Sequence, residues 1–150
     1  MKKVVLITGG SSGIGKAIGE YLVAKDYKVY GTSRDPDRFK LDFPFPLLQL
    51  DVTNTASIKA CVATLFEREA TLDVLINNAG VGITGPIEET PVEEIQKVFA
   101  TNVYGPIQIT NEVLPKMRLQ QRGHIINITS IAGYMGLPYR GIYSATKAAL

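Results

Sequence analysis

The sequence predicts an α/β fold, a three-layer α/β/α sandwich in which helices cover both faces of a parallel sheet. Short runs rich in valine, isoleucine and leucine alternate along the 150 residues with longer segments of helical periodicity. Most of these runs lack polar–apolar alternation, as is typical of strands buried on both faces. Alternating strands and helices imply parallel strands joined by crossover helices. The predicted strands are Val4–Ile7, Lys28–Thr32, Leu47–Val52, Val74–Ile76 and His124–Ile128.

Helical periodicity fills the first two long intervals. In residues 13–25 the apolar side chains that share one helical face are Ile14, Ala17, Ile18, Tyr21 and Leu22. In residues 55–69 the corresponding set is Ile58, Val62, Leu65 and Phe66. Asn54 or Thr55 is a suitable N-cap for this second helix.

The remaining helices are predicted from their end signals. Pro91 suits a first helical turn, and the acidic pair Glu93-Glu94 lies near the positive end of the helix that follows. That helix runs toward Arg118, and Gly105-Pro106 predicts a break or kink within it. A last helix is expected to begin near Tyr143.

Composition limits the function. The 16 basic and 14 acidic side chains give a net charge of +2, which argues against a general nucleic-acid-binding protein. Cys61 is the only cysteine, so an internal disulfide is impossible and a reducing compartment is expected. The apolar run after Lys3 is shorter than the ~7–15 residues of a signal-peptide core. No stretch approaches the ~20 apolar residues of a membrane helix. We expect a soluble cytoplasmic protein without a membrane partner.

A glycine-rich turn, Thr8-Gly9-Gly10-Ser11-Ser12-Gly13-Ile14-Gly15, follows the first strand and opens the first helix. Glycines allow a tight turn and a close approach of the backbone to a ligand, and the helix N-terminus favours a pyrophosphate. We expect a dinucleotide to contact Gly9, Ser11, Ser12, Gly13, Ile14 and Gly15. A turn without any ligand is the alternative. A Walker A loop is excluded, because Ala17 stands where that motif needs Ser or Thr after Lys16.

The end of the second strand indicates which dinucleotide is bound. A site that prefers NAD usually has Asp or Glu at this point, bonded to the ribose. Here Ser33 occupies that position and Arg34 follows it. A guanidinium can pair with a 2′-phosphate, so the pair favours NADP over NAD. Arg34 as a solvated surface residue is the alternative, and Asp35 can pair with Arg34 or bind the ribose itself.

Tyr143 and Lys147 lie four residues apart and therefore share one face of the last predicted helix. A phenol is a poor base at neutral pH, and a neighbouring ammonium favours the phenolate. This pair can therefore supply general acid–base catalysis. On its own the Tyr-x-x-x-Lys spacing is common on exposed helices.

Five motifs taken together resemble the short-chain dehydrogenase/reductase family over the whole chain. The glycine-rich turn resembles the cofactor turn of that family, and Asp51-Val52 its adenine-contacting pair. Asn77-Asn78-Ala79-Gly80 resembles its signature after the fourth strand. The residues that match its catalytic tetrad in order and spacing are Asn102, Ser130, Tyr143 and Lys147.

The resemblance implies a Rossmann-type fold and a role for each residue of the tetrad. Tyr143 exchanges the proton of the substrate hydroxyl, and Ser130 hydrogen-bonds the reacting oxygen. Lys147 bonds the nicotinamide ribose and favours the phenolate. Asn102 holds a water of a proton relay through a local distortion of its helix. A helix-breaking Asn102 and a turn-forming Ser130 without catalytic roles are the alternatives from residue type alone. The resemblance also implies that Asn78, Ala79 and Gly80 contact the cofactor.

The expected function is an NADP-dependent interconversion of a carbonyl and an alcohol. The segment Ile131 to Ile142 resembles the family's substrate wall, and its residues suit an apolar ketone, aldehyde or alcohol. A dinucleotide-binding sensor without turnover and an NAD-dependent dehydrogenase are the alternatives. His124 is the sole histidine, so neither a zinc cluster nor a histidine triad is expected.

The chain ends three residues after Lys147, inside a predicted helix. Members of the family continue beyond this point, so we expect a domain truncated at its C-terminus, part of a longer enzyme. The resemblance also implies a homo-oligomer, a dimer or tetramer, in the full-length form.

Overall fold

The computed structural model describes residues 2–39 and 43–150 and contains one parallel sheet of order β3-β2-β1-β4-β5. Its strands are β1 Val4–Ile7, β2 Lys28–Ser33, β3 Leu47–Gln49, β4 Val74–Asn77 and β5 His124–Asn127. All four pairings are parallel, and β1 lies between β2 and β4. The chain changes direction across the sheet at β1, so the crevice at the carboxyl ends of β1 and β4 is the expected ligand site.

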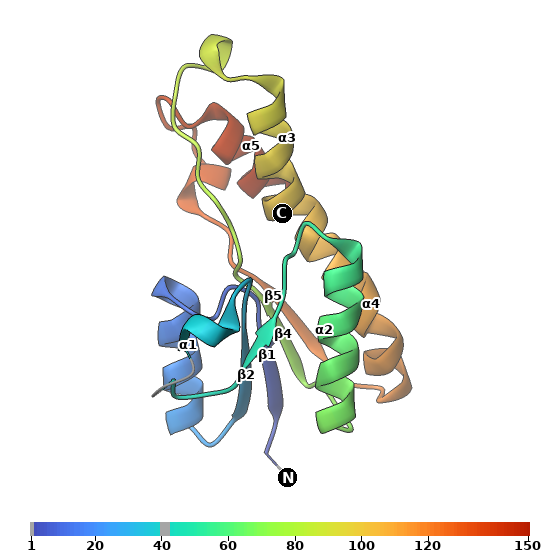
Figure 1. Ribbon diagram of the computed structural model, residues 1–150. Coiled ribbons are helices and arrows are strands. Elements are labelled where there is room, and N and C mark those ends of the chain that lie inside the picture. The colour runs from blue at the N-terminus through green and yellow to red at the C-terminus, as the bar shows by residue number, and fades with distance from the viewer. Residues whose placement is uncertain (1, 40–42) are drawn as a thin grey trace.

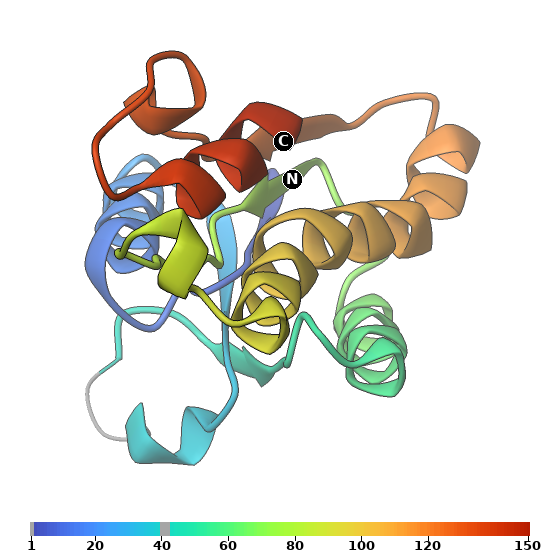
Figure 2. The same cartoon turned by 90° about the horizontal axis from the view of Figure 1, so that it is seen from above.

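Helices lie on both faces of the sheet, which confirms the Rossmann-like three-layer arrangement (Figures 1 and 2). Helix α1, Gly13–Ala24, lies on one side of the strands, and α2, Thr55–Arg68, lies with α4, Gly105–Leu119, on the other. Two buried clusters correspond to the two faces. Leu6, Leu65 and Val113 belong to the cluster under α2 and α4. Val5 and Ile76 belong to the cluster under α1.

Two further helices stand above the carboxyl edge of the strands. These are α3, Val92–Phe99, and α5, Gly141–Ala149, which pack against each other (Figure 1). A break or kink was predicted at Gly105-Pro106, and the structure has a π-helical turn over Ala100–Tyr104, immediately before these residues, that joins α3 to α4. Such π turns often occur at functional sites, and this one contains Asn102.

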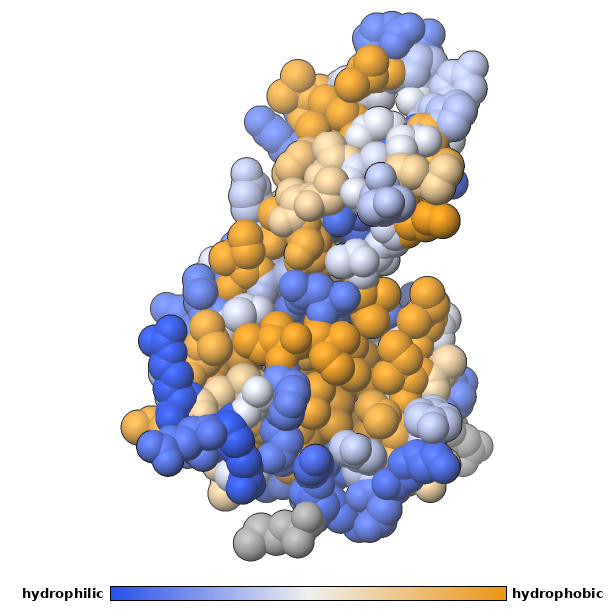
Figure 3. All heavy atoms as spheres, turned by 180° about the vertical axis from the view of Figure 1, so that it is seen from behind, coloured by the Kyte–Doolittle hydropathy of each residue, from blue (hydrophilic) through white to orange (hydrophobic). Residues whose placement is uncertain are grey.

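Three expectations about the strands and helices are wrong in detail. Strand β3 ends at Gln49 rather than Val52, because Asp51 turns the chain by accepting hydrogen bonds from the backbone and hydroxyl of Thr53. Strand β5 is exposed on both faces rather than buried, and Ile125 and Ile126 are 37% and 46% exposed. Figure 3 shows broad apolar surface on the side of the molecule that Figure 1 turns away from the viewer.

The buried face of α1 agrees with the predicted one only in part, because Ile18 and Leu22 pack against the core as predicted. Ile14 and Tyr21 are each 63% exposed, whereas Gly15 and Gly19 are buried. A β-carbon on Gly19 would lie 2.3 Å from the ring of Phe45, so the helix approaches the segment before β3 too closely for a side chain there. Periodicity of large apolar residues does not detect a helix face made by glycines.

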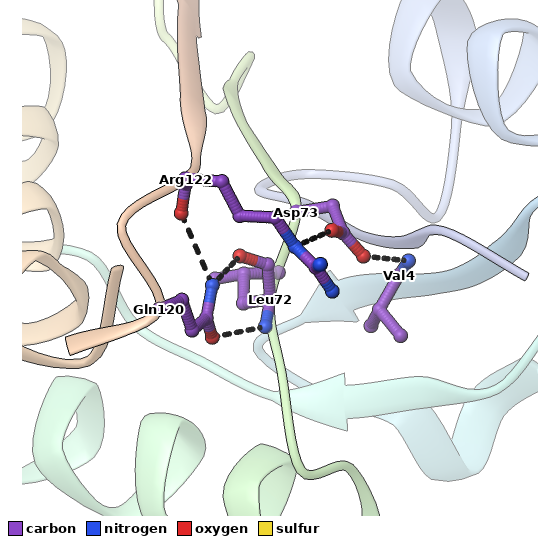
Figure 4. Close-up of polar contacts among 5 residues, drawn as sticks. All are labelled: Val4, Leu72, Asp73, Gln120 and Arg122. Atoms are coloured by element: carbon purple, nitrogen blue, oxygen red, sulfur yellow. Dashed lines mark hydrogen bonds and ion pairs between the residues drawn. The ribbon is translucent and has the colours of Figure 1, made fainter. Parts of the chain in front are cut away.

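Polar contacts fix the amino-terminal end of the sheet (Figure 4). The Asp73 carboxylate accepts hydrogen bonds from the Val4 backbone N–H at 2.9 Å and from Arg122 Nε at 3.1 Å. The Gln120 side chain pairs with both backbone groups of Leu72 at 3.0 Å. These contacts join β1, β4 and the loop before β5, and they leave the opposite edge of the sheet for the site.

Among the helices of the described residues, none combines the length and the apolar composition that a membrane span requires.

Candidate active site

The glycine-rich turn between β1 and α1 has the backbone geometry that the sequence predicts. Gly9 and Gly13 have φ values of +65° and +51°, which L side chains rarely adopt. A β-carbon on Gly9 would lie 3.0 Å from Ala79 Cα, and one on Gly15 would lie 2.4 Å from the Gly9 carbonyl oxygen. Glycine is therefore required at Gly9 by conformation and by space, at Gly13 by conformation and at Gly15 by space.

Asn78 fastens this turn to the end of β4. Its side-chain amide donates hydrogen bonds to the carbonyl oxygens of Thr8, at 2.9 Å, and Gly9, at 3.1 Å. In return Thr8 Oγ1 accepts hydrogen bonds from the backbone N–H groups of Asn78 and Ala79, both at 3.0 Å. The two chain segments that meet at the switch point of the sheet are thus locked together.

The N-terminus of α1 is open toward this region. The N-cap Ser12 makes no side-chain cap hydrogen bond, so the first N–H groups of the helix keep their capacity for a ligand. No acidic residue lies in the first turn. The partial positive charge of the helix end is therefore uncompensated by the helix itself, which suits a pyrophosphate.

A cleft of about 1010 Å³ runs along the carboxyl edge of the strands. The predicted cofactor residues that line it are Gly9, Ser11, Ser12, Ile14, Ser33, Arg34, Asp51, Val52, Asn78, Ala79 and Gly80. Gly13 and Gly15 shape the turn behind this lining. Sequence reasoning missed Arg38, Phe39, Thr53, Lys97 and Thr101, which also line the cleft. Arg38 follows Arg34 by four residues, and this spacing of two arginines was the available signal.

Arg34, Arg38 and Asp51 are the charged residues of interest in the part of the cleft near the end of β2. Arg34 and Arg38 are exposed in the cleft, and no ion pair joins Arg34 to Asp35 in the described part of the chain. Asp35 instead uses its backbone N–H to donate to Ser33 Oγ at 3.2 Å. The hydrogen bonds from Thr53 to Asp51, together with the charge of Arg34, lower the pKa of the Asp51 carboxyl. Asp51 is therefore ionised at neutral pH.

A smaller pocket of about 370 Å³ adjoins the cleft and contains Ser130 and Tyr143. Gly80 and Val81 line both cavities, so the two spaces meet at the loop after β4. Ser130 is the N-cap of the 3-10 turn Ile131–Gly133, where its Oγ accepts a hydrogen bond from Ala132 N–H at 3.1 Å. The Ser130 hydroxyl hydrogen remains available for a substrate oxygen.

Lys147 lies on the same helix, one turn after Tyr143, and is only 7% exposed. Its Nζ donates a hydrogen bond to the Ile128 carbonyl oxygen at 2.8 Å and lies 3.6 Å from the point that a β-carbon on Gly80 would occupy. Burial lowers the pKa of the Lys147 ammonium. Lys147 thus connects α5 to the ends of β4 and β5.

Asn102 is fully buried in the π-helical turn. Its Oδ1 accepts from Val81 N–H at 2.9 Å, and its Nδ2 donates to the Val81 carbonyl oxygen at 2.9 Å and to Thr146 Oγ1 at 3.0 Å. Thr146 in turn donates from its hydroxyl to the Tyr143 carbonyl oxygen at 2.7 Å. Asn102 therefore holds both the loop after β4 and the helix that carries Tyr143 and Lys147.

The predicted tetrad is brought together through these positioning contacts and not through direct bonds. Among residues 2–39 and 43–150, no hydrogen bond joins the Tyr143 hydroxyl to Ser130 or Lys147. Asn77 has a structural role, because its side chain donates to Asn127 Oδ1 at 2.9 Å between β4 and β5.

Comparison with known proteins finds relatives that are named as dehydrogenases or reductases. The family model for short chain dehydrogenases matches residues 3–150. The chain is 44% identical over 148 residues to the 3-ketodihydrosphingosine reductase of Bacteroides thetaiotaomicron, covering 99% of this chain and 54% of that protein. It is 35% identical over 160 residues to human retinol dehydrogenase 8, covering 99% of this chain and 50% of that protein. The chain thus spans about half the length of these relatives.

A solved structure also has a closely similar fold. The structure of ElxO with NADP bound superposes with a TM-score of 0.89 at 36% identity, covering 99% of this chain and 64% of that one. Three observations point to the same family. They are the parallel sheet, the glycine-rich turn at its switch point and the match of the family model to residues 3–150. The chain belongs to the short-chain dehydrogenase/reductase family.

Proposed function

We propose that this chain carries the cofactor-binding and proton-transfer parts of an NADP-dependent oxidoreductase that interconverts a carbonyl and an alcohol. One observation carries the proposal. The pocket that holds the Ser130 and Tyr143 side chains opens, at Gly80 and Val81, onto the cleft of the glycine-rich turn. A reacting group beside Tyr143 and a dinucleotide in the cleft would therefore meet at the loop after β4.

The cleft fits a dinucleotide in both shape and charge. The open N-terminus of α1 suits the pyrophosphate, and the absent β-carbons of Gly9 and Gly15 let the turn close. Asp51 and Val52 line the region proposed for adenine, and Arg34 and Arg38 offer two guanidiniums to a 2′-phosphate. When bound, the nicotinamide supplies or accepts the hydride.

The side chains of this pocket can then handle the proton. In the reducing direction the Tyr143 hydroxyl donates its proton to the carbonyl oxygen, and the Ser130 hydroxyl donates a hydrogen bond to the same oxygen. Lys147 places a positive charge one helical turn away, where it stabilises a phenolate electrostatically. Asn102 is a positioning residue, since all its side-chain polar atoms are used to hold Val81 and Thr146.

Two measurements test this proposal. Fluorescence titration should show that NADPH binds at least about tenfold more tightly than NADH, because only NADPH offers a 2′-phosphate to Arg34 and Arg38. Oxidation of NADPH should then follow addition of ketones or aldehydes, monitored at the nicotinamide absorbance. Tighter binding of NADH would overturn the choice of cofactor. Binding without turnover of any carbonyl would favour a dinucleotide-binding sensor.

A further inference from the structure

Arg140 places a positive charge in the pocket of Ser130 and Tyr143. Its guanidinium Cζ lies 5.9 Å from the centroid of the Tyr143 ring. Its Nη1 lies 3.5 Å from the point that a β-carbon on Gly82 would occupy. Both Arg140 and Gly82 line the pocket. Arg140 therefore spans from the start of α5 to the loop after β4 and forms one wall of the pocket.

Within the described residues, no acidic side chain forms an ion pair with this guanidinium, although the side chain is half-buried. An arginine cannot lose its charge to lower the cost of partial burial. Its charge thus faces a small polar pocket and remains available to an anion.

The backbone around Arg140 is strained and held on both sides. Tyr139 has a φ of +59°, a conformation that is rare for a bulky side chain. The Tyr139 carbonyl oxygen accepts a hydrogen bond from Gly85 N–H at 3.0 Å, and the Arg140 carbonyl oxygen accepts one from Ser144 N–H at 2.7 Å. Strained residues of this kind cluster at functional sites, where surrounding contacts maintain them. Here the strained residue is Tyr139, which directly precedes Arg140 and sets the direction in which the chain enters α5.

We propose that Arg140 binds the carboxylate of the substrate, so that this chain acts on oxo acids and hydroxy acids. This inference rests on the proposed function and names its substrate class. The planar guanidinium can pair with both oxygens of a carboxylate, which would orient the reacting carbonyl toward Ser130 and Tyr143. A pocket of about 370 Å³ requires the carbonyl and the carboxylate to lie close together in one molecule. Leu137 lines the same pocket and can contact an apolar remainder.

Matched substrates test the proposal directly. The rate constant kcat/KM with NADPH is measured for 3-oxobutanoate and for its uncharged methyl ester, on wild type, Arg140→Gln and Arg140→Lys. We expect Arg140→Gln to lower kcat/KM for the acid about 10–100-fold and to change that for the ester less than about twofold. Arg140→Lys should restore part of the loss. The control Arg118→Gln, at an exposed position of α4, should change neither. Equal effects on acid and ester, or none, overturn the proposal.

A binding measurement tests the carboxylate site without requiring turnover. Isothermal titration of butanoate into the protein–NADPH complex should show a carboxylate site that Arg140→Gln abolishes. Arg140-dependent binding of butanoate without turnover of any carbonyl would uphold the carboxylate site at Arg140 and refute the proposed function. Turnover of acid and ester alike, unchanged in Arg140→Gln, would refute the inference alone. A loss of NADPH affinity in Arg140→Gln with unchanged butanoate binding would assign Arg140 to the cofactor and likewise refute it.

Discussion

The side-chain amide of Asn102 pairs with Val81 as one backbone strand pairs with another, accepting from its N–H and donating to its carbonyl oxygen, both at 2.9 Å. This contact joins the π-helical turn before α4 to the loop that follows β4. A third hydrogen bond, to Thr146 Oγ1 at 3.0 Å, extends the connection to α5. The loop shared by the cleft and the smaller pocket is thus held by one fully buried residue.

Replacing Asn102 with alanine should destabilise the fold and impair turnover together. The change removes three hydrogen bonds, of which the one to Thr146 is buried and the two to Val81 are partly buried, and it leaves backbone groups of Val81 without their partner, at up to about 1–3 kcal/mol for each unsatisfied group. Urea unfolding measures the loss, and Asn111→Ala at an exposed position of α4 is the matched control. A change in the free energy of unfolding below about 0.5 kcal/mol, the range of ordinary surface substitutions, would contradict this assignment.

Gly9→Ala should weaken NADPH binding by about tenfold or more. Alanine at this position would have to adopt a φ of +65° and place its β-carbon 3.0 Å from Ala79 Cα, so the turn must shift. The control Gly136→Ala adds a β-carbon where nothing lies within 4 Å, and it should leave binding unchanged. Fluorescence titration compares the two variants. Wild-type affinity in Gly9→Ala would show that the turn does not contact the dinucleotide.

The guanidinium of Arg34 should determine the choice between NADPH and NADH. Arg34→Gln removes a charged partner of the 2′-phosphate, so the ratio of the two affinities should fall about 10–100-fold through weaker binding of NADPH. Adding Ser33→Asp should strengthen NADH binding through the ribose hydroxyls. The surface variant Arg118→Gln controls for the loss of one positive charge. An unchanged ratio in Arg34→Gln would assign discrimination to Arg38 or to none of these residues.

Lys147 should give the stability of the protein a specific pH dependence. Burial lowers the pKa of its ammonium in the folded state, so the unfolded chain binds more protons between that lowered value and the ordinary value near 10.4. Stability should therefore rise with pH through this window, by at most about 1.4 kcal/mol per pH unit. Urea unfolding at a series of pH values, compared with Lys147→Met, isolates this contribution. Parallel profiles for the two proteins would refute it.

Tyr143→Phe should abolish turnover and leave the affinity for NADPH within about twofold. The variant removes only the hydroxyl that transfers the proton, a contribution of about 10²–10⁴-fold in rate. Tyr21→Phe, at a 63% exposed position of α1, is the control for loss of a tyrosine hydroxyl. Stopped-flow measurement of NADPH oxidation at saturating ketone gives the rate. Retained turnover in Tyr143→Phe would assign proton transfer to another group.

The order of the elements, the parallel sheet and most of the predicted residues along the cleft follow from local features of the sequence. Apolar runs and helical periodicity are local signals, because each element buries a stripe or face that its own residues define. The glycine-rich turn is a local signal of the same kind, whereas the distortion of the helix at Asn102 was implied by the resemblance to the family. Each strand end that carries a motif then meets the others at one edge of the sheet.

Contacts between residues far apart in the chain follow from the packing of the elements. Gly19 belongs to the buried face of α1 because Phe45 approaches it from another segment. The exposure of β5 depends on what lies beside the strand and not on its apolar composition. Arg38 and Arg140 reach their cavities through a 3-10 turn and a strained residue, neither of which has a periodic signal. Contacts between residues far apart in the chain depend on strand order and close packing, which local sequence does not encode.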